Sequence, residues 1–338
     1  MTGSSGKPLK AFAGKSAFEI IQSAKLTESE QTEVCSEAHD SFGIGAVKLN
    51  VLIYIVWNKV KNIQIIVNEE KDRGLILTGS ITAYLRERGV EAQSCVVRRN
   101  DVLCFDTDRL PECLITLGGD GTFIQAACKA AESGIPIFGI NLGNVGYLTE
   151  VEKDNIFPAL DRLLSGRYVT ENRMMLRGRC VSQESAEEGL ALNDIVISRH
   201  GSLRAVRYEL FVNNRLLNTY DADGLIVSTP TGSTGYNLSA GGPIVEPTAR
   251  LILVNPICPH TLNTRAIVLS ADDTVRVRVV GGRFPQEYEA EVSYDGGRNA
   301  MLSPRQEVTI SCAMVEARLI RLGEESFLDI LSRKMRDR

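Results

Sequence analysis

The chain has 338 residues, of which 43% are hydrophobic and 24% are charged, and its formal net charge is −4. This length suggests two domains, and the composition is that of a globular chain, which excludes a mainly disordered or fibrous protein. The mild acidity and the lack of clustered Lys and Arg argue against nucleic-acid binding.

Neither the cysteines nor the N-terminal segment indicates a metal site, a membrane span or export. The eight scattered cysteines include no Cys-x-x-Cys pair, and three histidines give no zinc-ligand spacing. We therefore expect no protein-held metal, and reduced thiols in a cytoplasmic protein, with a disulfide framework as the less favoured alternative. Residues 1–59 form an extension without an interpretable motif, for which a transit peptide is the alternative. Residues 51–57, the most apolar run, are far fewer than the ~20 residues of a membrane span and predict a buried strand or helix.

From residue 60 the chain alternates between strand and helix signals. A short apolar run over 63–67 predicts a strand, and a helix is expected over about 72–88 with Gly89 as its stop. Another strand over 113–117, a turn over 118–122, a helix over 123–133 and a strand over 135–140 follow. This order predicts a βαβ unit and a parallel sheet in an α/β domain over 60–150.

Beyond about residue 170 the hydrophobic period changes to that of strands. Residues 204–212 and 215–220 alternate around Asn213 and Asn214 and predict a hairpin. Alternation recurs over 274–280 and 289–295, with short strands expected near 306–311 and 315–322. Residues 151–322 are thus expected to form an antiparallel β-rich domain of two packed sheets. A final helix near 325–336, within the segment 323–338, has Phe327, Ile330 and Leu331 on one face and is expected to dock back on the first domain.

The first chemical motif is Gly-Gly-Asp-Gly-Thr at residues 118–122, between a strand and a helix. Glycines there let a ligand approach the backbone, and the helix that follows offers free N–H groups to phosphate. An aspartate in such an anion site is out of place unless it binds a metal or takes a proton. The alternative is a tight turn in which Asp120 caps the helix.

Three further segments offer polar groups. Residues 139–150, rich in Gly and Asn, follow the next strand and would border the same crevice, although turn-forming residues alone could explain them. Asn193 and Asp194 precede a strand, and an Asx-type turn explains them equally well. Residues 221–243 combine hydroxyl side chains, glycines and one tyrosine, which suits the sugar and base of a nucleotide better than a plain turn region. Within that segment, Asp223 could accept hydrogen bonds from ribose hydroxyls.

Together with residues 256–262, these segments closely resemble the NAD kinase family, particularly its bacterial members, over about residues 60–330. The first motif alone is shared with diacylglycerol and sphingosine kinases and with phosphofructokinases, whereas residues 221–243 discriminate. The resemblance implies a Rossmann-like N-terminal domain, a β-rich C-terminal domain, and an active site between them. It also implies a homodimer or homotetramer that phosphorylates NAD to NADP with ATP or polyphosphate.

The resemblance assigns roles to individual residues. Asp120 matches the catalytic aspartate, and Asn193 and Asp194 match a pair that contacts the ribose and nicotinamide side of NAD. Tyr147 matches an aromatic position near the adenine. Other matching positions, which hold the adenine and riboses, are Asp223, Thr231, Thr234, Tyr236 and Ser239. Gly235 departs from the family's usual alanine, and losing that methyl group should loosen the turn.

We expect phosphoryl transfer by positioning and charge neutralisation. The N–H groups of Gly118, Gly119, Asp120, Gly121 and Thr122 would cradle the donor phosphates, with Mg²⁺ bridging phosphate oxygens. The Asp120 carboxylate would orient the 2′-hydroxyl and accept its proton.

Three other functions stay open at this stage. A lipid kinase would share the first motif but should lack residues 221–243. A regulator that binds NAD or NADP without catalysis would form no NADP. An oxidoreductase would need a proton donor, for which the sequence offers no candidate.

Overall fold

The computed structural model describes residues 60–97, 109–143, 146–181, 186–201, 204–261, 264–280, 289–297, 299–323 and 326–336. The extension 1–59, with its apolar run 51–57, lies outside these residues. In the part that is described, no helix combines the length and the apolar character needed to cross a membrane.

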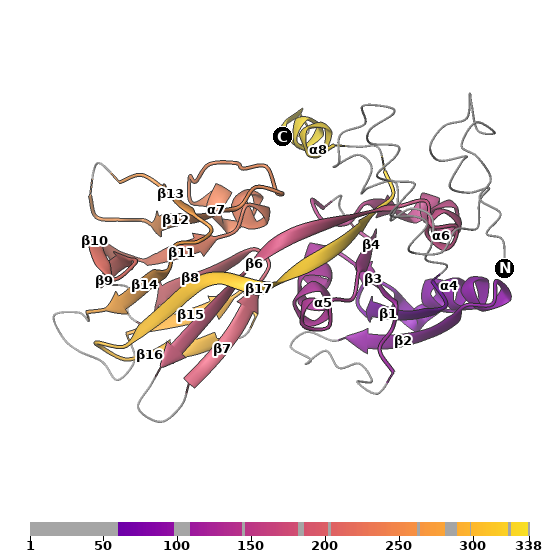
Figure 1. The fold of residues 1–338 in the computed structure, drawn as a ribbon, viewed down its shortest axis with the longest axis horizontal. Coiled ribbons are helices and arrows are strands. Elements are labelled where there is room, and N and C mark those ends of the chain that lie inside the picture. The colour runs from indigo at the N-terminus through magenta and orange to yellow at the C-terminus, as the bar shows by residue number, and fades with distance from the viewer. Residues whose placement is uncertain are drawn as a thin grey trace, which may run out of the picture.

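The N-terminal half is a parallel sheet covered by helices on both faces (Figure 1). Its strands are β1 (Asn62–Asn68), β2 (Glu91–Val97), β3 (Cys113–Gly118), β4 (Ile137–Asn141) and β5 (Val151–Glu152). Its helices are α4 (Ile76–Glu87), α5 (Asp120–Glu132) and α6 (Ile156–Leu164), with short 3-10 turns at Arg73–Leu75 and Lys153–Asn155. Side chains of α4 and α6 pack with one face of the sheet, and those of α5 with the other. The predicted βαβ unit is confirmed, since β3 and β4 pair in parallel around α5.

The C-terminal half is built from antiparallel strands. They are β6 (Val169–Val181), β7 (Ala186–Ala191), β8 (Asp194–Arg199), β9 (Val206–Val212), β10 (Arg215–Ala222), β11 (Gly224–Ser228), β12 (Leu251–Ile257), β13 (Ile267–Ser270), β14 (Val275–Val279), β15 (Ala290–Tyr294), β16 (Asn299–Leu302) and β17 (Glu307–Arg321). A 3-10 turn (Thr231–Thr234) and a short helix, α7 (Tyr236–Ser239), follow β11, and α8 (Phe327–Arg336) ends the described chain. The hairpin β9–β10 is confirmed, with Asn213 and Asn214 both at positive φ in its turn.

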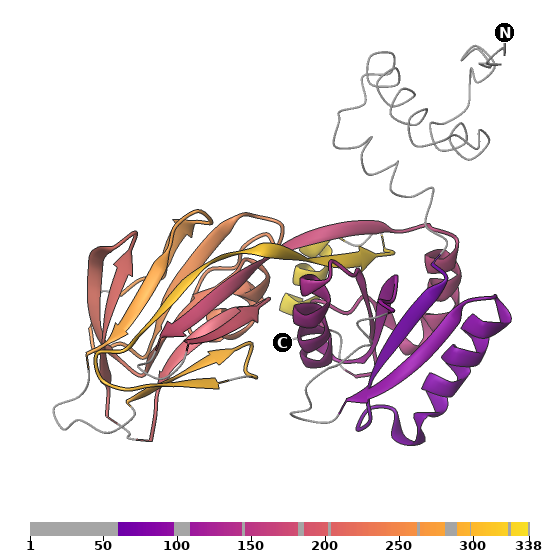
Figure 2. The same cartoon turned by 60° about the horizontal axis from the view of Figure 1, so that its bottom comes forward.

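The described strands form an eleven-stranded and a six-stranded sheet. The larger sheet runs through both halves, because β17 pairs with β4 at Leu319 and Ile137 and with β6 along most of its length. Figure 2 shows β6 and β17 passing side by side from one half to the other. The predicted fold class, an α/β domain followed by a two-sheet antiparallel β domain, is confirmed.

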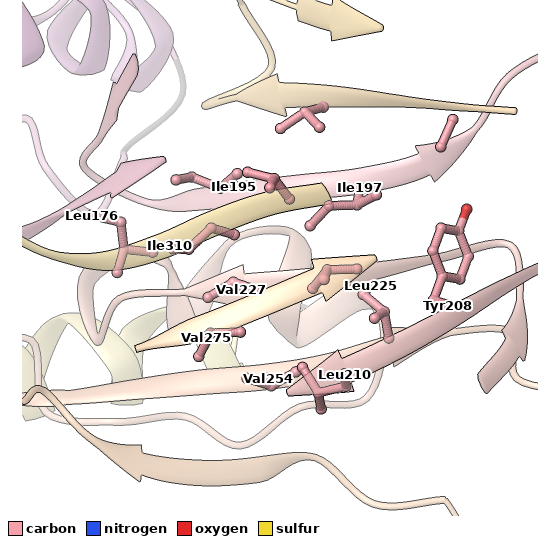
Figure 3. Close-up of a cluster of buried hydrophobic side chains, with 14 of the residues drawn as sticks. Leu176, Ile195, Ile197, Tyr208, Leu210, Leu225, Val227, Val254, Val275 and Ile310 are labelled. Atoms are coloured by element: carbon pink, nitrogen blue, oxygen red, sulfur yellow. The ribbon is translucent and has the colours of Figure 1, made fainter. Parts of the chain in front are cut away.

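The largest hydrophobic cluster lies between the two sheets of the C-terminal half. Figure 3 shows side chains of both sheets in it, including Ile195, Ile197, Leu225, Val227 and Val254 from one sheet and Leu176, Tyr208, Leu210, Val275 and Ile310 from the other. Each buried aliphatic side chain contributes about 1.5–3 kcal/mol relative to an exposed one. This core therefore supports the loops that emerge from β8 and β11.

Two sequence predictions were wrong in detail. The strands expected near 306–311 and 315–322 are one strand, β17, interrupted by a register shift between Cys312 and Glu316. The turn expected over 118–122 is shorter, because α5 begins at Asp120 and the extended Gly119 is its N-cap residue. An acidic residue is favourable at this positive end of a helix.

Candidate active site

Asp120 lies where β3 passes into α5. The turn is tight, since a Cβ on Gly118 would lie 2.6 Å from the Thr122 Oγ1. By contrast, a Cβ on Gly119 or Gly121 would meet nothing within 4 Å. Packing within the described protein therefore does not demand these two glycines, and their small size leaves room beside the N–H groups of the first helical turn.

The loop after β4 holds the Asp120 carboxylate. The backbone N–H groups of Tyr147 and Leu148 donate to it at 2.9 and 3.3 Å, and the Thr149 hydroxyl donates at 3.4 Å. A Cβ on Gly146 would lie only 1.9 Å from the Asp120 Oδ1, so this close approach requires glycine. The alternative role of Asp120 as a side-chain helix cap is wrong, because its carboxylate serves the neighbouring loop and the N-cap residue is Gly119.

A cavity of about 170 Å³ lies between the two halves, beside this loop. Three predicted residues line it together: Tyr147 from the first half, and Thr231 and Thr234 from the second. The wall also contains Arg173, which is 4% exposed and donates to the Thr231 hydroxyl at 3.2 Å. Burial lowers the pKa of Arg173, while its ion pair with Glu171 acts in the opposite direction. The cavity thus joins an aromatic ring, hydroxyls and a paired guanidinium.

Asn193 and Asp194 are held by a carboxylate that the sequence did not single out. The Asp295 side chain accepts the backbone N–H groups of Leu192, Asn193 and Asp194 at 2.7–3.0 Å. It also accepts the Cys128 thiol of α5 at 3.3 Å, and so links the two halves. In the sequence, Asp295 ends an alternating strand before two glycines and looks like an ordinary turn residue, so no local signal could have found it.

This arrangement places the buried Asp194 carboxyl group near that of Asp295. Burial raises the pKa of Asp194 from 3.8 to about 7, and the neighbouring Asp295 adds to the shift. Burial also raises the pKa of Asp295, although the hydrogen bonds that its carboxylate accepts lower the pKa in part. Two nearby carboxyl groups of like charge disfavour the form in which both are ionised.

The segment after β11 fits closely against Asn193. Thr229 donates its N–H to the Asn193 carbonyl oxygen at 2.8 Å, and a Cβ on Gly232 would lie 2.1 Å from the same oxygen. At Gly235 a Cβ would lie 3.3 Å from the Gly232 oxygen and 3.6 Å from the Asn193 Nδ2. The departure from alanine at residue 235 therefore leaves a small gap beside the Asn193 amide.

The remaining predicted residues do not line the cavity. Asp223 accepts the Arg199 Nε–H at 2.9 Å. Tyr236 is 46% exposed, and burial raises its pKa with further contributions from Cys258, Asp194 and Asp223. Ser239 is exposed at the end of α7 and does not line the cavity. The structure thus brings Tyr147, Thr231 and Thr234 together at the cavity beside the loop that holds Asp120. It does not bring all the others together, because Asp194 and Asp223 lie at opposite ends of β8.

An α/β half with a glycine-rich turn at the end of a parallel strand shares two strands with a β sandwich, and a polar cavity lies between them. This arrangement is typical of a nucleotide-binding protein. The model of the ATP-NAD kinase N-terminal domain matches residues 56–168, and that of the C-terminal domain matches residues 192–322. The chain is 41% identical to the NAD kinase of Agathobacter rectalis over 281 residues, which cover 82% of this chain and 99% of that relative. It is 39% identical to the NAD kinase of Lachnoclostridium phytofermentans over 289 residues, covering 82% and 100%. The chain belongs to the NAD kinase family.

Solved structures agree with this assignment. An NAD kinase from Archaeoglobus fulgidus in complex with ATP has a TM-score of 0.65 and 25% identity, covering 82% of this chain and 99% of that one. Yeast NADH kinase complexed with NADH has a TM-score of 0.68 at 22% identity, covering 81% and 86%. The yeast protein supports the fold.

Proposed function

We propose that the chain transfers the terminal phosphate of ATP to the 2′-hydroxyl of the adenosine ribose of NAD, which gives NADP. The observation that carries this proposal is the position of Asp120. Its carboxylate is fixed by Tyr147, Leu148 and Thr149, and two of these residues, Tyr147 and Leu148, also line the cavity. A substrate in the cavity would lie next to a preorganised proton acceptor.

The adenosine of NAD would occupy the cavity, with the adenine near Tyr147 and polar contacts from Thr231 and Thr234. Asn193 and Asp194 would contact the other ribose and the nicotinamide side. Asp223, Tyr236 and Ser239 would complete the ribose and adenine contacts. Asp295 would act as a positioning residue, since it fixes the backbone of residues 192–194.

In the reaction, the 2′-oxygen forms a bond to the γ-phosphorus as the bond from that phosphorus to the β,γ-bridging oxygen breaks. ADP leaves with the electron pair of the broken bond, and the 2′-hydroxyl proton passes to an oxygen of Asp120. The N–H groups of Gly118, Gly119, Asp120, Gly121 and Thr122 would hold donor phosphate oxygens. Because Asp120 stands at the helix N-terminus, it can face both the acceptor hydroxyl and the donor.

Mg²⁺ fits the site as a companion of the donor. Among the described residues, no group of three or more His, Cys, Asp and Glu side chains could hold a metal ion by itself. A Mg²⁺ ion held mainly by the donor phosphate and waters would need few protein ligands. When bound, the ion would neutralise phosphate charge.

The proposal extends to organisation and location. Residues 60–150 would bind the donor, residues 151–322 would hold most of NAD, and the helix within 323–338 would dock on the first half. A homodimer or homotetramer is supported by the edge strand β10, where Leu216 and Leu217 are 56% and 50% exposed. A cytoplasmic location is supported by the described cysteines, which are free thiols.

The direct test is the formation of NADP from NAD, or of NADPH from NADH, by the full chain with ATP or polyphosphate as donor. We expect NADP from NAD and ATP. Formation of neither NADP nor NADPH from any pair of substrates would overturn the proposal, and phosphorylation of diacylglycerol instead would favour a lipid kinase. Binding of NAD without turnover would favour a regulator.

The role of Asp120 has its own test. Asp120→Asn keeps the shape but removes the proton acceptor, and we expect kcat to fall by about 10²-fold or more. The KM for NAD should change little, because Asp120 does not hold the base. Near-wild-type turnover of Asp120→Asn would contradict this role.

A further inference from the structure

A second cavity, of about 280 Å³, adjoins Asp120 on the side of β4 and α8. Gly146 and Thr149 line it, and both contact Asp120: the Thr149 hydroxyl donates to its carboxylate, and Gly146 lies against the same oxygens. Asn141, at the carboxyl end of β4, lines it as well. Ligands of open α/β sheets bind at such strand ends. The cavity therefore opens beside the reacting groups.

The nucleotide motifs lack the positive charge that a phosphate donor requires. Residues 118–122, 141–146, 193–194 and 223–239 contain no Lys or Arg. A triphosphate carries several negative charges, and phosphoryl transfer depends on neutralising them. Either cationic side chains from outside these motifs neutralise the phosphate charge, or the backbone N–H groups and a metal ion must neutralise it alone.

Two arginines from the C-terminal end of the chain line this second cavity. Arg321 is the last residue of β17, and Arg333 lies on α8. Two glutamates also line it, Glu150 and Glu152. Glu150 accepts the backbone N–H groups of Leu322 and Gly323, which binds it to the segment that leads into α8. Arg321 is 11% exposed, with its Nε 3.9 Å from a Glu171 carboxylate oxygen in the wall of the first cavity.

The two cavities meet at these elements. Arg321 and Ile330 line both of them, and Lys334 of α8 lies 4.5 Å over the Tyr147 ring. The α8 helix lies beyond residue 322, where the family match ends. It therefore contributes to the site from outside the part of the chain that the family model describes.

We propose that this second cavity binds the linear phosphoanhydride chain of the donor behind the phosphate that the N–H groups of residues 118–122 hold, and that Arg321 and Arg333 are its phosphate ligands. This inference rests on the proposed function, because it takes the first cavity as the place of the adenosine of NAD. Guanidinium groups suit the task, since they stay charged and pair with phosphate oxygens in bidentate fashion. The chain could belong to ATP or to inorganic polyphosphate.

The test uses the full chain with Arg333→Gln, and with Arg336→Gln as the matched control. Arg336 lies on the same helix, is exposed, and lines neither cavity. We expect Arg333→Gln to raise the KM for ATP and the dissociation constant of tripolyphosphate about tenfold or more. The KM for NAD should change less than about twofold. Arg333→Lys should recover part of the loss, and Arg336→Gln should match wild type.

The outcomes separate this inference from the proposed function. Equal ATP and tripolyphosphate values for Arg333→Gln and Arg336→Gln would overturn the inference, as would an effect confined to the KM for NAD. Equal melting temperatures of the two variants would show that a change at Arg333 is not a folding defect. If wild type forms no NADP, the proposed function fails, and tripolyphosphate binding by the same variants still decides the inference. An effect on tripolyphosphate but not on ATP assigns the cavity to inorganic polyphosphate.

Discussion

At the scale of single residues, the geometry of the site depends on glycines that leave space for neighbouring atoms as well as on polar side chains. Gly146 lets the loop after β4 reach the Asp120 carboxylate, where a Cβ would lie 1.9 Å from the Oδ1. Because the carboxylate accepts three hydrogen bonds from this loop, any shift breaks several of them. The position of the proton acceptor is therefore set by a glycine 26 residues further along the chain.

Gly146→Ala tests this dependence. The added methyl group must displace the Asp120 carboxylate, and we expect kcat to fall by about 10-fold to 100-fold, since misplacement by about 1 Å can have that effect. The control is Gly79→Ala in α4, where a Cβ meets nothing within 4 Å. This control should keep full activity and gain about 0.5–1 kcal/mol of stability. Unchanged kcat in Gly146→Ala would contradict the close fit.

Asp194 makes a prediction about stability and pH. Its pKa is raised from 3.8 to about 7 by burial and by Asp295, so the folded state holds a proton that the unfolded chain releases. The free energy of unfolding should therefore fall as pH rises from about 4 to about 7. Asp194→Asn removes this penalty, and at pH 8 we expect it to be more stable than wild type by roughly 2–4 kcal/mol, with the gain disappearing near pH 4.

The measurement is urea unfolding from pH 4 to pH 8, with the exposed Asp272 changed to Asn as the control. Asp272→Asn should follow the wild-type curve. Parallel curves for Asp194→Asn and wild type over this range would show that the carboxyl group is not buried as the structure has it.

At the scale of elements, local sequence patterns predicted most strands and helices. The remaining features depend on contacts between residues that are far apart in sequence. The strand over 113–117, the hairpin around Asn213 and Asn214, and the last helix followed from hydrophobic period and turn residues. The continuity of β17 did not follow, because alternation breaks between Cys312 and Glu316, where the Met314 side chain is 96% exposed. Asp295 was missed for a similar reason: its partners lie about 100 and 167 residues away in sequence.

The paired strands β6 and β17 predict a pattern of hydrogen exchange. They lie inside the larger sheet and pair over twelve residues, so their amides should exchange among the slowest in both halves. The α8 helix has only Ile330 buried and should exchange much faster. Exchange measured by mass spectrometry checks this. Fast exchange of β17 in one half alone would contradict a continuous strand.

At the scale of the whole molecule, the site is assembled by elements that are far apart in sequence. The Asp120 turn and its loop come from the parallel sheet, Thr231 and Asp194 come from the sandwich, and α8 returns from the end of the chain. Two shared strands and the contact of Asp295 with Cys128 hold these parts together. NAD and the donor would therefore meet between the halves, in two cavities that share Arg321 and Ile330.

The most direct measurement follows the transferred phosphate. The full chain is incubated with NAD and ATP labelled in the γ-phosphate, and the dinucleotide product is cleaved at its pyrophosphate. We predict that the label is recovered in adenosine 2′,5′-bisphosphate. Label at another position of the product, or on the protein without transfer to NAD, would contradict the proposed reaction.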